Sequence, residues 1–198
     1  VNQRDELVIS YVRWILVRKR DAAAPAPEPS VPDLPEAVGT DSLIVPDELD
    51  LAGYDTAAAG GDGLWDDYEP GERIDHRDGV TIEDAEHMML TRLSQNSAPI
   101  HFNARLSEGT RFGRRVVMGG HIIGLARTLT FNGFANAFKL ATINGGRHTA
   151  PTFAGDTIFA WSEVLQKIAL PSRTDVGALR LRTVGVKNEE CAKFPFKK

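Results

Sequence analysis

Hydrophobic and polar residues alternate in the first part of the chain with the two-residue period of a strand. Across residues 6–17 both faces of such a strand are apolar, which predicts a strand that is covered on two sides. One face carries Leu7, Ile9, Tyr11, Ile15 and Val17, and the other carries Val8, Val12, Trp14 and Leu16.

Two later stretches have the spacing of amphipathic helices. In residues 80–93, VTIEDAEHMMLTRL, Thr81 and Asp84 form a weaker version of a capping box, so we expect Thr81 to be the N-cap. Residues 119–133, GGHIIGLARTLTFNG, predict a second, mostly buried helix that ends at Asn132-Gly133. The apolar stripe of the first helix comprises Ala85, Met88, Met89 and Leu93, and that of the second comprises Ile122, Leu125, Ala126 and Leu129.

Strand-like sequence follows the helices. The stretches NAFKLATI, PTFAGDTIFAWSEVLQKI and GALRLRTVGVK, at residues 136–143, 151–168 and 177–187, are separated by turn signals. Helices followed by consecutive strands indicate an α+β fold with an antiparallel sheet.

The chain divides into three regions by composition. Residues 1–20 hold the first strand, and residues 21–63 are a Pro-, Ala- and Gly-rich linker and surface arm. Residues 64–198 form the compact domain. Because the chain begins with Val1 rather than methionine, we expect it to be a fragment.

Composition narrows the possible partners and the compartment. The chain has 198 residues, 42% of them hydrophobic, and a net charge of −4, which argue for a globular protein and against nucleic acid or an anionic membrane as partner. A single cysteine, Cys191, rules out an internal disulfide and fits a reducing compartment. The apolar stretch 7–17 is too short to span a membrane, and we expect a cytoplasmic protein.

Histidines are the first candidates for chemistry. His76 and His87 have no evident partner in the sequence and are interpreted as structural or solvated. His121 and His148 can line a cleft, although neither has a defined partner. No pair of histidines has the spacing of a metal site, so we predict no catalytic metal.

The segment RFGRRVVMGGH, residues 111–121, places arginines before two glycines that open a helix. Free backbone N–H groups at Gly119 and Gly120 suit an oxyanion, and Arg114 and Arg115 suit a nucleotide phosphate. A tight turn before a core helix, with solvated arginines, is the alternative.

The segment SQNSAPIHFN, residues 94–103, offers one proton carrier and one orienting group. His101 can exchange a proton near neutrality. Asn96 can hold a water molecule but cannot accept its proton. Any acid–base chemistry here is therefore assigned to His101.

These segments together resemble the MaoC-like enoyl-CoA hydratases and dehydratases. The resemblance rests on the helix from Thr81, on N-x-x-P-I-H at 96–101, on GGHIIGLA at 119–126 and on GDTIFAWSEV at 155–164. It implies the hot-dog fold, an antiparallel sheet wrapped around a central helix that begins near Gly120, over residues 64–187. Residues 1–20 resemble the last strand of a preceding hot-dog repeat, as in members that carry two repeats in one chain.

The resemblance also implies an activity, the reversible addition of water to an enoyl-CoA thioester. The family's catalytic histidine falls on His101 and its backbone oxyanion donor on Gly120, whereas its aspartate falls on Asn96. This leaves a one-base site in which Asn96 orients water, a second acid from elsewhere, or a repeat without activity. We favour the one-base site.

The substrate expected by resemblance is a branched C4-dicarboxylic acyl-CoA. Its carboxylate would meet Arg147 or His148, its phosphates would meet Arg114 and Arg115, and Gly119 and His121 would line the site. No cofactor is expected, since coenzyme A is part of the substrate, and the partner is a second hot-dog repeat or a second copy of the chain. The rival functions are a non-catalytic acyl-CoA-binding scaffold and, with less support, a thioesterase.

Overall fold

The computed structural model describes residues 1–12, 15, 17, 19–28, 30–171 and 173–196. Contacts within the chain divide it into two units, Val1–Leu34 and Pro35–Lys198. In the described part of the first unit no residue belongs to a helix or a strand. Every helix and strand described below therefore lies in the second unit.

The strand predicted across residues 6–17 is absent from the described positions 6–12, 15 and 17. Their apolar side chains are exposed, for example Leu7 at 73% and Val17 at 76%. A strand is held by hydrogen bonds to a neighbour, and none of the described residues pairs with this stretch. Trp14 and Leu16 lie outside the described residues, and the assignment of this stretch to a preceding repeat stays a prediction.

The second unit is built on one antiparallel sheet. Its longest strands are β3 (Thr157–Leu170) and β4 (Arg173–Lys187), and the short strands are β1 (Arg73–Asp75) and β2 (Val80–Thr81). Ile158 pairs with Val80 on one side and with Lys187 on the other, and Trp161 likewise lies between β1 and β4. Hence β1 and β2 together occupy the edge of β3 opposite β4.

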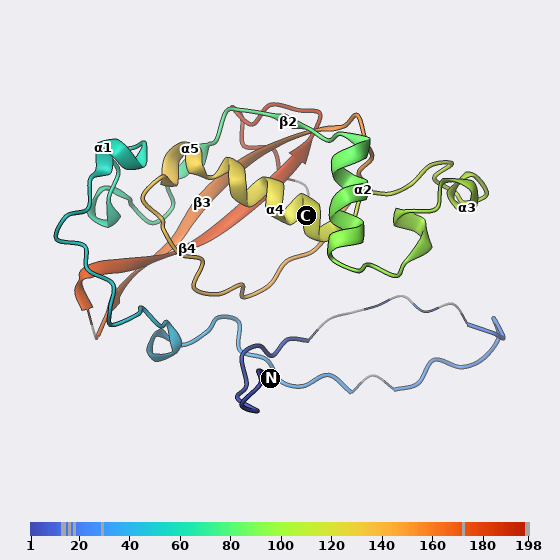
Figure 1. Cartoon of the computed structure of the whole chain (residues 1–198), viewed down its shortest axis with the longest axis horizontal. Coiled ribbons are helices and arrows are strands. Elements are labelled where there is room, and N and C mark those ends of the chain that lie inside the picture. The colour runs from blue at the N-terminus through green and yellow to red at the C-terminus, as the bar shows by residue number, and fades with distance from the viewer. Residues whose placement is uncertain (13–14, 16, 18, 29, 172, 197–198) are drawn as a thin grey trace. The chain divides into compact units, whose positions relative to one another are not determined.

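The helices are short except for two. The two long ones are α2 (Asp84–Leu93) and α4 (Gly119–Leu129). The α-helices α1, α3 and α5 span Thr56–Ala59, Ala104–Glu108 and Phe131–Phe134, and the 3-10 helices η1, η2 and η3 span Thr40–Ser42, Trp65–Asp67 and Pro99–His101. In Figure 1, α4 lies along the β3–β4 hairpin, and α2 stands beside the start of α4.

Helix α4 is the central helix that the sequence predicts. Its side chains at Ala126 and Leu129 are buried against Ile158 and Ala160 of β3, with Ile122 and Leu125 packed around them. The chain turns at Gly133, whose φ of 123° is in the left-handed region and whose Cβ would lie 2.6 Å from Ile74. The predicted helix end at Asn132-Gly133 is three residues too late, since α4 ends at Leu129, while Asn132 and Gly133 have non-helical backbone angles within α5.

The predicted capping of the first helix is wrong. Thr81 belongs to β2, and its hydroxyl pairs with that of Thr157 at 2.8 Å. Helix α2 starts at Asp84 after Glu83, which makes no side-chain cap bond. The main chain of Ile82 continues the sheet instead, since its N–H donates to the carbonyl of Asp156 at 2.9 Å.

The stretch 136–143 was expected to be a strand, and none of its residues is in one. It holds the surface arm instead. Asn136 accepts a hydrogen bond from the hydroxyl of Tyr54 at 2.9 Å, and Lys139 donates to the carbonyl of Ile44 at 2.6 Å. Because these side chains are used for the arm, the alternation of apolar residues there does not build a sheet edge.

Candidate active site

His101 is held by the segment that leads into α4. It ends η3, and its Nδ1 lies 2.8 Å from the carbonyl oxygen of Val116. The N–H of Val116 donates in turn to the carbonyl of Ile100 at 3.1 Å. Two hydrogen bonds thus fix the 96–101 arm to the residues just before the central helix.

This contact decides which ring nitrogen of His101 can react. A carbonyl oxygen only accepts hydrogen bonds, so Nδ1 must carry the proton that is donated to Val116. In the neutral ring the lone pair is then on Nε2, which makes no hydrogen bond to any described residue. Nε2 is therefore the nitrogen of His101 that is free to accept a proton, and its role as the catalytic base stays a prediction.

Asn96 lies one turn beyond α2. Its N–H donates to the carbonyl of Thr91 at 3.1 Å, and its Oδ1 accepts from the N–H of Ala98 at 2.9 Å. The side-chain oxygen is thereby occupied, and the NH₂ group remains as a hydrogen-bond donor. Asn96 opens on a cavity of about 340 Å³ lined by Met88, Thr91, Arg92, Gln95, Asn96 and Phe102, a list that does not include His101.

The start of α4 presents free backbone donors. The first N–H groups of a helix have no acceptor within it, and those of Gly119 and Gly120 find no backbone acceptor among the described residues. A Cβ at Gly119 would collide with the imidazole of His148. A side chain at position 119 would therefore displace the imidazole of His148, which belongs to the exposed 144–150 loop.

The two arginines expected at a phosphate have separate contacts. Arg115 forms an ion pair with Asp84 at the start of α2. The Arg114 guanidinium lies 4.0 Å from the ring centroid of Phe153. Arg147 is exposed and makes no ion pair or hydrogen bond with any described residue. The structure thus brings His148 to Gly119 but does not join Arg114, Arg115 and Arg147 in one cluster.

Two of the remaining histidines differ in how they are satisfied. His76 is buried, and its ring nitrogens contact the carbonyl of Asn132 at 2.7 Å and the hydroxyl of Ser162 at 2.8 Å. Its interpretation as structural is confirmed. His87 is also buried, with 1% of its surface exposed, but neither ring nitrogen has a hydrogen-bond partner among the described residues.

The charged groups that act on His87 include residues of the candidate site. Burial lowers its pKa, and the charges of Arg115, His101 and His121 act in the same direction, while Asp84 opposes them. His121 is itself buried, with Nε2 3.6 Å from Glu86. Sequence reasoning missed His87 at this site; the polar pair His87 and Thr91, four residues apart on α2, was the signal.

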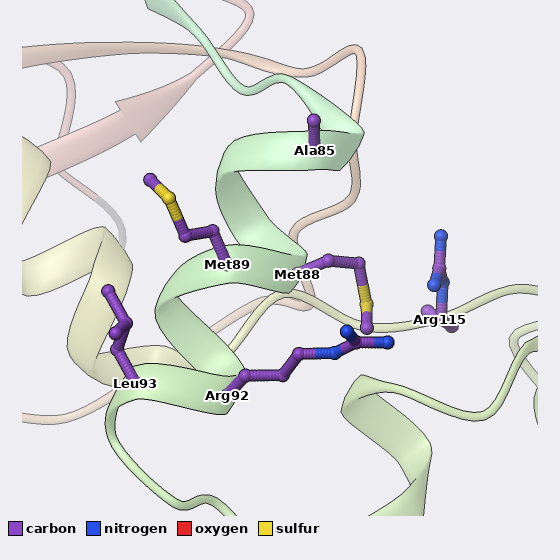
Figure 2. A pocket seen from close by; sticks show the side chains of 6 residues that line it. All are labelled: Ala85, Met88, Met89, Arg92, Leu93 and Arg115. Atoms are coloured by element: carbon purple, nitrogen blue, oxygen red, sulfur yellow. The ribbon is translucent and has the colours of Figure 1, made fainter.

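The apolar stripe of α2 faces outward and not toward the core. Met89 and Leu93 are exposed, whereas the buried side chains of this helix are those of His87 and Thr91. Figure 2 shows the stripe as one wall of a second cavity of about 540 Å³. Its lining consists of Ala85, Met88, Met89, Arg92, Leu93 and Arg115.

Metal ligands are not gathered in the described part of the chain. No group of three or more His, Cys, Asp or Glu side chains there is placed to hold an ion. The expectation of a metal-free site stays a prediction. Among the described residues, no helix is both long and apolar enough to cross a bilayer.

Residues 67–185 match the family model described as the MaoC-like domain. The matched region includes the 96–101 arm, the start of α4 and most of both long strands. The chain belongs to the MaoC-like domain family. The resemblance inferred from the four sequence segments is thereby confirmed.

Two curated relatives of this MaoC-like chain have the names of enzymes. It is 61% identical over 197 residues to beta-methylmalyl-CoA dehydratase of Chloroflexus aurantiacus, covering 100% of this chain and 56% of that protein. It is 53% identical over 188 residues to mesaconyl-CoA hydratase of Cereibacter sphaeroides, covering 95% of this chain and 54% of that one. The chain thus spans about half the length of the curated relatives it matches.

Solved structures confirm the fold of the MaoC-like domain. A crystal structure described as a MaoC domain protein dehydratase from Chloroflexus aurantiacus is 62% identical with a TM-score of 0.85, over 91% of this chain and 51% of that one. A Mycobacterium tuberculosis protein with a double hotdog fold is 28% identical with a TM-score of 0.52, over 77% of this chain and 44% of that one. The expected hot-dog fold is confirmed.

Proposed function

We propose that this chain carries the catalytic residues of a hydro-lyase that interconverts mesaconyl-CoA plus water and β-methylmalyl-CoA. The names of the two curated relatives support this reaction. The observation that carries it is the geometry of His101, whose Nδ1 is bound to the carbonyl of Val116 while Nε2 is left unpaired. A base held in one tautomer with a free ring nitrogen is what hydration of an enoyl thioester requires.

In the hydration direction, Nε2 of His101 accepts a proton from water as the water oxygen bonds to the β-carbon. The electrons of the double bond move toward the thioester, and the charge reaches its carbonyl oxygen. The protonated imidazole then returns a proton to the α-carbon, so one base completes the addition. Dehydration follows the same steps in reverse.

Asn96 and the start of α4 supply the remaining contacts. With Oδ1 occupied by Ala98, the NH₂ group of Asn96 can donate to the water oxygen and orient it toward the base. The unpaired N–H groups of Gly119 and Gly120 can donate to the thioester oxygen, whose negative charge is further stabilised by the helix dipole. Asn96 thus replaces the orienting function of a carboxylate but not its capacity to carry a proton.

The other expectations from sequence extend this proposal. Arg114 and Arg115 are candidates for the coenzyme A phosphates, His121 for the wall of the site, and Arg147 or His148 for the free carboxylate of the acyl group. No cofactor other than the coenzyme A of the substrate is proposed. The partner is a second hot-dog repeat or a second copy of the chain, which agrees with the match to about half of each relative. The proposed location is the cytoplasm.

The test is a product assay on the intact protein. Mesaconyl-CoA is supplied, and the formation of β-methylmalyl-CoA is followed by chromatography while free coenzyme A is measured with a thiol reagent. The proposal expects hydration to an equilibrium that is also reached from β-methylmalyl-CoA, without release of free coenzyme A.

Two other results would each replace the proposal. Release of free coenzyme A without hydration would identify a thioesterase. Binding of the thioester with neither reaction would identify the non-catalytic scaffold, which Asn96 favours because its amide cannot act as a second base.

A further inference from the structure

Two side chains of α2 are shared by both cavities. Met88 and Arg92 line the cavity that contains Asn96 and also the larger cavity that contains Arg115. In Figure 2, Arg92 extends from the last turn of α2 beneath the Met88 thioether toward Arg115. Arg92 is the one cationic residue in the lining of the cavity of Asn96.

Arg92 differs from Arg114 and Arg115 because its guanidinium has no partner among the described residues. Arg115 is paired with Asp84, and the guanidinium of Arg114 lies over Phe153. Arg92 makes no ion pair or side-chain hydrogen bond with any described residue. The other described arginines without an ion pair or a side-chain hydrogen bond line neither cavity; they are Arg20, Arg77, Arg105, Arg111, Arg114 and Arg147.

The main chain holds Arg92 and Asn96 close together. The N–H of Asn96 donates to the carbonyl of Thr91 at 3.1 Å, which closes the end of α2 and returns Asn96 to the last turn. Met88 and Phe102 add apolar side chains to the lining of the same cavity. A cavity of this kind, apolar with a few polar groups, is typical of small-molecule sites.

The chemistry of the substrate requires a cation at this place. In a β-methylmalyl thioester the new hydroxyl and the free carboxylate are on the same carbon. A carboxylate therefore lies beside the carbon that water attacks, within the reach of a side chain next to Asn96. A planar guanidinium can donate two parallel hydrogen bonds to a carboxylate and fix its orientation.

We propose that Arg92 binds the free carboxylate of the acyl group and makes the site specific for dicarboxylic acyl thioesters. This inference rests on the proposed function for the identity of the substrate. It assigns the carboxylate to Arg92 in place of Arg147 or His148, both of which are exposed and line neither cavity. Arg92 acts by binding and takes no proton.

The test compares two thioesters that differ in the carboxylate. Binding of succinyl-CoA and of butyryl-CoA to the intact protein is measured by calorimetry, because neither thioester has the double bond needed for hydration. Wild type, Arg92→Gln and Arg92→Lys are compared with Arg105→Gln, a matched control on α3 whose guanidinium is unpaired and outside both cavities.

Wild type is expected to prefer succinyl-CoA. Arg92→Gln is expected to weaken succinyl-CoA binding about 10- to 100-fold, the range of a charge-assisted contact, and to leave butyryl-CoA unchanged. Arg92→Lys is expected to recover part of the loss, since lysine keeps the charge but not the paired donors. Arg105→Gln is expected to match wild type.

Three results would overturn the inference. Equal weakening of both thioesters in Arg92→Gln would assign Arg92 to the coenzyme A moiety that they share. Equal binding of both thioesters by wild type would remove the specificity itself. Loss of the preference in Arg147→Gln, with Arg92→Gln unaffected, would assign the carboxylate to Arg147.

The same experiment separates this inference from the proposed function. Binding is measured without turnover, so an intact protein that does not hydrate mesaconyl-CoA can still show the preference and its loss in Arg92→Gln. In that case the hydro-lyase proposal fails and the carboxylate site stands.

Discussion

The two long helices of the domain use their apolar residues in opposite ways. Helix α4 buries Ala126 and Leu129 against β3, whereas α2 buries His87 and Thr91 and exposes Met89 and Leu93. Both sequences have a helical apolar stripe, so the stripe alone does not say what it faces. The difference shows that α4 is the core of the fold and α2 is a wall of the candidate site.

Shortening one leucine on each helix tests this difference directly. Leu129 is 5% exposed, and Leu129→Ala is expected to lower the free energy of unfolding by about 2–5 kcal/mol through the cavity it leaves. Leu93 is 73% exposed, and Leu93→Ala is the matched control, with a change within about 0.5 kcal/mol. Urea unfolding followed by circular dichroism measures both. Equal losses would mean that α2 is packed like α4.

A smaller effect is expected where α4 begins. Gly119→Ala places a methyl group against the exposed imidazole of His148 and is expected to cost about 0.5–1.5 kcal/mol of stability, the cost of forcing that ring off its rotamer. Removing the ring in Gly119→Ala/His148→Ala is expected to recover most of that loss. A double variant as unstable as Gly119→Ala would show that the loop does not pack on the helix start.

Only a small change in stability at neutral pH is expected from replacing His87. Burial of the unpaired ring lowers its folded pKa below the usual 6.5. Below pH 6.5 the unfolded chain then binds more protons than the folded one, so stability falls as the pH drops from 6.5 through the folded pKa. His87→Leu is expected to stay within about 1 kcal/mol of wild type at pH 7.5.

The pH dependence is the decisive measurement for His87. Urea midpoints from pH 7.5 to pH 5 are expected to fall less steeply in His87→Leu than in wild type. Some slope remains in the variant because the pKa of His76 is also lowered by burial. Parallel curves for the two proteins would show that His87 is not held neutral by the fold.

The sequence was sufficient for the central helix and for the β3–β4 hairpin because both combine periodicity with clear turn signals. Gly119 and Gly120 open α4, and Gly133 is in the left-handed turn after it. The same reasoning failed for residues 6–17 and 136–143. An alternating pattern shows that a strand is possible, but a strand forms only where another strand supplies hydrogen bonds.

The residues of the candidate site could be proposed from the sequence, but their contacts could not. The 96–101 motif pointed to His101 and Asn96, and the structure adds the hydrogen bond from His101 to Val116, which leaves Nε2 as the nitrogen free to react. Arg92 and His87 were missed because their significance depends on cavities and burial. Both are properties of tertiary packing that a helical spacing does not reveal.

The most direct test of the account is the activity of His101→Asn with mesaconyl-CoA. The asparagine amide takes the place of Nδ1 and can keep the hydrogen bond to Val116, while the base at Nε2 is lost. The account predicts that kcat/KM falls about 10²- to 10⁴-fold, with the affinity for butyryl-CoA and the thermal midpoint close to wild type. Hydration at the wild-type rate would contradict the assignment of His101 as the base.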